Sequence, residues 1–74
     1  MAHLTKTQRE IVEFVAAYLG REERSPTYDE IAEGCGYACR AVAYQLDKLE
    51  DAGVLSRRRH AGRVVARSIE LVEA

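Results

Sequence analysis

The spacing of apolar residues near the start of the chain predicts an amphipathic helix with a capping signal ahead of it. Thr5 and Gln8 stand three residues apart, the spacing at which each side chain satisfies a free backbone N–H of the other. The apolar stripe that follows consists of Ile11, Phe14, Val15 and Tyr18, widened by Val12 and Leu19. We expect Gly20 to end this helix and residues 21–26 to form an exposed loop closed by proline.

A second helix of short length is predicted directly after this loop. Thr27 and Glu30 form another capping box, just ahead of the apolar pair at 31–32. Gly34 weakens the helix, and Gly36 can supply the left-handed residue that ends it. Only two residues, 37–38, then separate it from the next helical pattern. Two helices joined so tightly form a helix-turn-helix unit.

A third helix is predicted from Cys39 to about Ala52, with Gly53 as its stop. Its core stripe holds Val42, Leu46 and Leu49, with Cys39 at the upper end, and its outer face holds Arg40, Ala41, Tyr44, Asp47, Lys48 and Asp51. Beyond it we expect a strand over 54–57, a turn over 58–62 and a second strand over 64–72. This order predicts one domain over residues 1–74, mainly α with a small β-hairpin: a three-helix winged helix-turn-helix.

Composition and charge narrow the class of protein. The 74 residues are 47% hydrophobic and 31% charged, which is typical of a globular chain. No apolar run suits a membrane span or a signal peptide, and two cysteines suit a reducing compartment, so we expect a cytoplasmic, nucleoid-associated protein of bacterial, archaeal or phage origin. The net charge is −1, yet residues 53–74 carry five arginines against two glutamates. Local charge, more than total charge, attracts phosphate.

The outer face of the third helix is the first candidate site. Its N-terminal half is small, rich in hydrogen-bond donors and free of acid, as suits a helix that enters the major groove of DNA. Arg40 can bond guanine or phosphate, Tyr44 can contact phosphate or a thymine methyl, and Gln45 can reach adenine. The alternative is that these are ordinary solvated positions of a surface helix.

The arginines of the hairpin are the second candidate site. Arg57, Arg58, Arg59 and Arg63 surround one turn, where all of them are expected to reach phosphate. The alternative is a solvated edge hairpin whose charges block aggregation. Directly after a helix-turn-helix, the hairpin is better interpreted as a DNA-contacting wing over about residues 56–67.

Cys35 and Cys39, with His3 and His60, are the residues that a metal site could use. One cysteine pair without a second pair does not match a zinc motif, so we expect two small core thiols, with a metal- or redox-responsive switch as the alternative. No motif for catalysis or phosphate binding is present, and caps or solvated faces account for the carboxylates. We therefore expect a binding module, not an enzyme, without cofactor, membrane association or small-molecule substrate.

Four segments resemble a known family. They are Leu4-Thr5-x-x-Gln8-x-x-Ile11, Ser25-Pro26-Thr27-x-x-Glu30-Ile31-Ala32, Gly36-Tyr37 and Leu46-x-x-Leu49-x-x-x-Gly53-Val54-Leu55. Together, over about residues 4–72, they resemble the N-terminal DNA-binding domain of the LexA repressors. The resemblance implies a third helix, about 39–52, in the major groove and a wing on the DNA backbone. The predicted DNA-binding residues are Thr27, Cys39, Arg40, Ala41, Tyr44, Gln45, Lys48, Arg57, Arg58, Arg59 and Arg63.

The chain departs from the family pattern in two ways. It is one residue shorter between Tyr37 and Leu46 and its groove-facing residues differ, so the family's operator sequence is not expected. We also expect no counterpart of the self-cleaving peptidase domain or of the domain through which LexA dimerises. We expect a sequence-specific regulator of the repressor type that binds double-stranded DNA as a homodimer. The alternative is a winged helix that serves as a protein–protein adaptor, favoured by the acidic segment 25–52.

Overall fold

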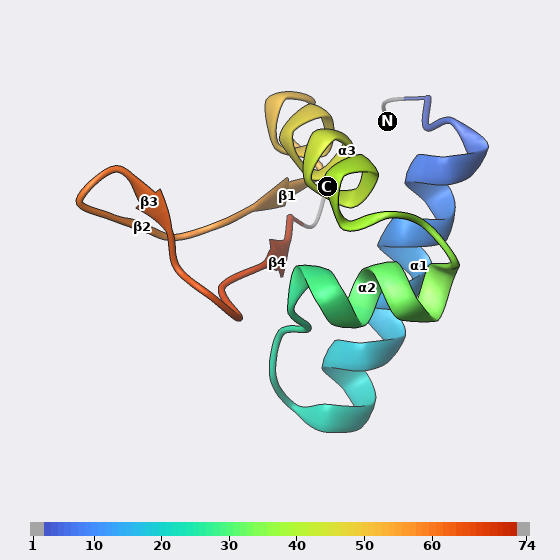
Figure 1. Ribbon diagram of the computed structural model, residues 1–74, viewed down its shortest axis with the longest axis horizontal. Coiled ribbons are helices and arrows are strands. Elements are labelled where there is room, and N and C mark those ends of the chain that lie inside the picture. Colours follow the sequence, from blue (N-terminus) through green and yellow to red (C-terminus); the bar gives the residue numbers. More distant parts are fainter. Residues whose placement is uncertain (1–2, 73–74) are drawn as a thin grey trace.

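The computed structural model describes residues 3–72. Within them, helices α1 (Lys6–Glu22), α2 (Tyr28–Cys35) and α3 (Cys39–Asp51) precede four two-residue strands: β1 (Leu55–Ser56), β2 (Arg59–His60), β3 (Arg63–Val64) and β4 (Glu70–Leu71). Figure 1 shows the helices packed into one body, from which the β2–β3 ribbon projects. The predicted fold class, mainly helical with a winged helix-turn-helix order, is confirmed.

Both predicted capping boxes are present at the starts of the first two helices. The Thr5 hydroxyl accepts the backbone N–H of Gln8, and the Gln8 side chain accepts the N–H of Thr5. Thr27 and Glu30 exchange the same two hydrogen bonds at α2. Gly36, with φ of 79°, ends α2 in the left-handed conformation as expected.

The first helix runs beyond its predicted end. The prediction that Gly20 stops it is wrong, because the left-handed residue that closes α1 is Glu23, whose N–H bonds the carbonyl of Leu19. The loop after it is also less exposed than predicted. Ser25 and Pro26 are buried, since the Ser25 hydroxyl accepts the N–H of Ile69 from the strand region.

The core lies between the three helices and the first ribbon. The apolar stripes predicted for the helices supply it, and the strand region closes it. Its fully buried members are Ile11, Val15, Ile31, Val42, Leu46, Leu49, Leu55 and Ile69. Gly34 has a packing role that its helix-weakening effect did not predict. A Cβ built on it would lie 2.1 Å from Cε2 of Phe14, so only glycine lets this ring lie on α2.

The predicted hairpin is divided into two antiparallel ribbons. In one, β1 pairs with β4, and in the other β2 pairs with β3. The prediction of one continuous strand over 64–72 is wrong, because Arg67 adopts a left-handed φ of 55° and the Ser68 hydroxyl donates to the carbonyl of Val65 at 2.6 Å. The predicted turn also shrinks to Ala61 and Gly62, which both have positive φ, the arrangement of a tight two-residue hairpin turn.

Candidate nucleic-acid interface

The outer face of α3 is exposed as the helical spacing predicted. All six residues assigned to it are exposed: Arg40, Ala41, Tyr44, Asp47, Lys48 and Asp51. The Tyr44 side chain is the most prominent apolar group on this face, at 58% exposure, and the Lys48 Nζ lies 5.4 Å from the centre of its ring. The cation and the aromatic ring therefore form one amphipathic patch in the middle of the helix.

The start of α3 faces α2 through a cysteine. The Cys39 thiol is exposed and donates to the Asp29 carboxylate over 2.7 Å, so the prediction that it is a core residue is wrong. The cause is its place in the first turn, ahead of the buried stripe that begins at Val42. The Asp29 carboxylate raises the pKa of the Cys39 thiol, which keeps the thiol protonated.

The other cysteine behaves as predicted. Cys35 is half-buried against the core and lies 3.9 Å from the carbonyl of Glu10. Burial raises the pKa of this thiol as well, so neither sulfur is poised as a nucleophile. Nowhere between residues 3 and 72 do three or more histidine, cysteine or acidic side chains gather as a metal site would require.

Two predicted contact residues already hold intramolecular hydrogen bonds. The side-chain oxygen of Gln45 (Oε1) accepts a hydrogen bond from the side-chain nitrogen of Gln8 (Nε2) at 3.1 Å, which turns the Gln45 side chain toward α1. The Thr27 hydroxyl accepts the Glu30 N–H that starts α2. Contact of either group with DNA would use its remaining hydrogen-bonding capacity or exchange these bonds.

Arg57 is not an exposed arginine of the wing. Only 2% of its side chain is accessible, and its Nη2 bonds Asp47 at 2.6 Å and Glu50 at 2.7 Å. Its Nη1 also donates to the Tyr28 hydroxyl on α2. The prediction that Arg57 reaches phosphate at the turn is therefore wrong. We call Asp47 and Glu50, which hold it, the α3 clamp.

The clamp engages a second arginine at the surface. Arg59 donates Nη1 and Nη2 to the two oxygens of Glu50, at 3.0 and 2.7 Å. The guanidiniums of Arg59 and Arg57 lower the pKa of Glu50 from 4.5 to about 2. The expectation that caps and solvated faces account for all carboxylates is wrong here, because Glu50 lies between two arginines of the wing.

The cations that the described part of the wing leaves unpaired are Arg58 and Arg63. Both side chains are exposed, and in the part of the chain that the structure describes neither forms an ion pair. His60 lies opposite Arg63 in the β2–β3 register. The wing therefore presents two free guanidiniums and one imidazole around the Ala61–Gly62 turn.

Arg67 ties the far end of the wing to α2, a role that the sequence did not indicate. Its guanidinium bonds Glu30 at 2.9 and 3.1 Å and the carbonyl of Ser25 at 3.1 Å. Hydrogen bonds from Arg67 and from the Thr27 backbone lower the pKa of Glu30 to about 2. No linear pattern predicts this pair, because 37 residues separate the two side chains.

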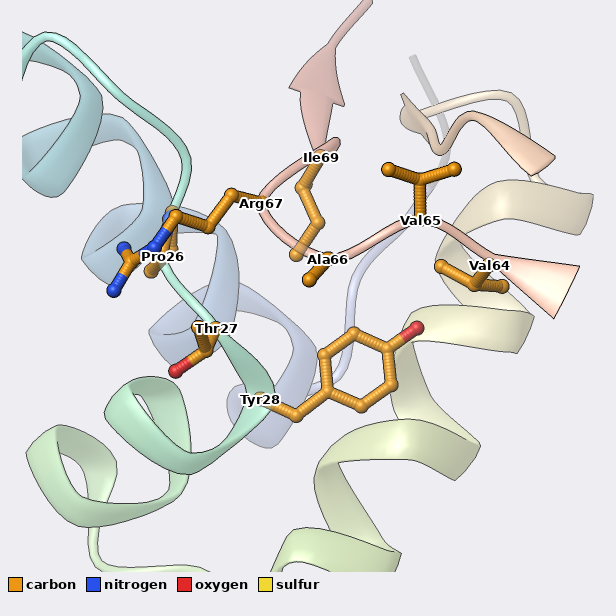
Figure 2. A pocket seen from close by; sticks show the side chains of 8 residues that line it. All are labelled: Pro26, Thr27, Tyr28, Val64, Val65, Ala66, Arg67 and Ile69. Atoms are coloured by element: carbon orange, nitrogen blue, oxygen red, sulfur yellow. The ribbon is translucent and has the colours of Figure 1, made fainter. Parts of the chain in front are cut away.

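A small groove lies between the wing and the start of α2. Figure 2 shows the Tyr28 ring facing Val64 and Ala66, while the Val65 side chain points away from the ring and the Arg67 side chain turns toward Pro26. Its volume is about 210 Å³, below the roughly 300–1,000 Å³ typical of ligand pockets. Because the groove is small and its one charged group is paired with Glu30, it does not suit a polar substrate.

The chain is similar to known proteins over nearly all of its length. The LexA DNA binding domain family matches residues 1–64. The LexA repressor of Koribacter versatilis (strain Ellin345) is 36% identical over 73 residues, covering 97% of this chain and 33% of that protein. The LexA repressor of Stenotrophomonas maltophilia (strain R551-3) is 40% identical over 72 residues, covering 96% and 32% respectively. The chain thus spans about a third of the length of these relatives.

None of the helices described between residues 3 and 72 has both the length and the apolar character needed to cross a bilayer.

Proposed function

Because this chain belongs to the LexA DNA binding domain family, we propose that residues 1–74 act as one winged helix-turn-helix domain that binds double-stranded DNA and represses transcription. In this proposal α3 enters the major groove and the wing lies on the phosphate backbone. The relatives are named as repressors, which supports repression over activation. The proposed function is binding without catalysis, and it is carried out in the cell compartment that holds the DNA.

The exposed start of α3 supports its role as the reading helix. Arg40 and Ala41 are exposed in the first turn, which holds no acidic residue, and Tyr44 follows one turn later. A helix presents its N-terminal residues to base edges when it enters the major groove. Arg40 can bond guanine bidentately, and Tyr44 can pack on a thymine methyl.

The observation that carries the proposal is the attachment of the wing to the reading helix. Arg57, at the base of the wing, bonds Asp47 on the outer face of α3. The bond therefore holds the wing beside the face that carries Tyr44 and Lys48. A groove-reading helix and a cationic ribbon held side by side suit one stretch of duplex, which presents base edges flanked by phosphates.

Salt dependence tests the contribution of the wing. A fluorescein-labelled duplex of mixed sequence is titrated with protein at about 50–200 mM salt, and anisotropy gives the affinity. We expect R58A and R63A each to reduce the slope of log K against log salt by about 0.9, the value for one phosphate contact. R24A is the matched control, since Arg24 is exposed and the loop between α1 and α2 lies at the opposite end of the body from α3 (Figure 1). The proposal fails if the native chain binds no duplex at the lowest salt, a result that favours the protein–protein adaptor.

Selection of bound duplexes from a random pool tests the role of α3. We expect one preferred site, and R40A should weaken binding to it by about 1–3 kcal/mol while affecting mixed sequence much less. An equal loss on both duplexes would assign Arg40 to phosphate. We also propose a homodimer on DNA, since one small domain alone binds weakly. A palindromic site with two chains per duplex in sedimentation analysis would support it, and one chain per site would refute it.

A further inference from the structure

Glu50 is the acidic residue that bonds two arginines of the wing at once. Its side chain is 21% exposed and accepts from the backbone N–H, Nε and Nη2 of Arg57, and from both terminal nitrogens of Arg59. One of these two partners is buried, and the other is 47% exposed. The carboxylate therefore joins the fixed base of the wing to a guanidinium that solvent can reach.

This pairing changes the effective charge of the wing. Arg59 would be a third phosphate-binding arginine beside Arg58 and Arg63, but both of its terminal nitrogens are directed to Glu50. The pair with Glu50 occupies the same two parallel N–H donors that a bidentate contact with phosphate would need. Arg57 holds Glu50 in place, so the carboxylate cannot follow Arg59 toward the DNA.

Resting on the proposed DNA-binding function, we infer that Glu50 is a positioning residue that withholds Arg59 from the phosphate backbone. Phosphate contacts supply nearly all of the sequence-independent binding. By removing one cation from these contacts, Glu50 lowers the affinity for random DNA and leaves more of the discrimination to α3. Discrimination between sites depends on the ratio of specific to non-specific affinity.

A double-mutant cycle on a mixed-sequence duplex tests this role. R59A in the native background should leave the slope of log K against log salt unchanged. E50Q, which keeps the shape and the hydrogen-bond acceptor, should steepen the slope by about 0.9, so that its advantage over the native chain falls about threefold between 50 and 200 mM salt. The double variant E50Q/R59A should return to the native slope.

The charge-matched control is D51N, on the last residue of α3. In the described part of the chain no lysine or arginine pairs with Asp51, so this change removes the same charge without freeing a guanidinium. We expect D51N to raise affinity slightly through the long-range field and to leave the slope at the native value.

Two results would overturn the inference. One is a loss of about 0.9 in slope for R59A alone, which would mean that Arg59 already binds phosphate. The other is a folded E50Q whose slope equals that of the native chain. If E50Q fails to fold, R59A still decides, because its side chain is half-exposed. Failure of the proposed function differs from both results, since the native chain would then bind no duplex at all.

Discussion

Arg57 and Arg58 are adjacent, and the structure predicts that the same substitution destabilises the fold strongly at Arg57 and hardly at all at Arg58. Arg57→Met keeps most of the length of the side chain but removes the guanidinium that bonds Asp47, Glu50 and Tyr28. Arg58→Met removes a guanidinium from an exposed side chain. We expect R57M to lower the free energy of unfolding by about 2–3 kcal/mol and R58M to change it by less than about 0.5 kcal/mol.

The magnitude follows from what each partner loses. Asp47 is 67% exposed and returns to water, so its part is less than about 1 kcal/mol. Glu50 is 21% exposed and loses most of its charged hydrogen bonds with Arg57, worth about 1.5–3 kcal/mol before Arg59 compensates for some of it. The Tyr28 hydroxyl adds about 1 kcal/mol. Together these losses amount to about 2.5–5 kcal/mol, and the compensation by Arg59 at Glu50 brings the expected loss to about 2–3 kcal/mol.

Urea unfolding followed by the helical circular dichroism signal measures this difference. With a slope of about 1 kcal/mol per molar for a chain of this size, R57M should reduce the midpoint by about 2–3 M. A domain of this length has roughly 4–11 kcal/mol of total stability, so the variant remains folded without urea. Equal midpoints for R57M and R58M would refute the reasoning, because the α3 clamp would then contribute nothing to holding the wing.

Three further predictions concern backbone conformation and pH. Gly34→Ala should destabilise the fold by about 1–3 kcal/mol, because the new methyl group overlaps the Phe14 ring. Gly20→Ala, in open space within α1, should stabilise the fold by about 0.5–1 kcal/mol. Thermal midpoints of the two variants that move in the same direction would contradict this pairing. Ala61→Gly should stabilise the hairpin turn by about 1 kcal/mol, since the native φ of 53° strains any residue with a Cβ. Amide hydrogen exchange in the wing should become slower in this variant, and an unchanged exchange rate would refute the prediction. Glu50 has a folded pKa of about 2 and an ordinary value of 4.5, so the stability that it contributes is complete above pH 4.5 and is lost as the pH falls toward 2. Urea midpoints should therefore fall less with acidification in E50Q than in the native chain. An equal fall in both proteins would contradict the assignment.

The helical part of the fold was predictable because its signals are local. A capping box is a contact across three residues, and an apolar stripe is a repeat of three or four, so both can be identified in a short window of sequence. The two capping boxes and the stripe of Val42, Leu46 and Leu49 are confirmed for this reason. Gly20 misled the prediction, since a glycine that fits within a helix does not have to end it.

The wing was harder to predict because its conformation depends on contacts between distant residues. The break between its two ribbons depends on Arg67, whose partner Glu30 is 37 residues away. Four arginines close in sequence carried no sign of which would be buried. Alternation along a strand predicts opposite faces, but not what each face meets.

The sequence by itself therefore determined three helices, their caps, their buried faces and a cationic segment after them. Those properties follow from hydrogen bonds and side-chain spacing within a few residues. Only the tertiary structure decided that Arg57 lies inside the α3 clamp, that Arg59 shares Glu50 with it, and that Arg58 and Arg63 remain exposed. The physical reason is that an ion pair depends on distance in space. Packing of the first ribbon against α3 sets those distances for Arg57 and Arg59.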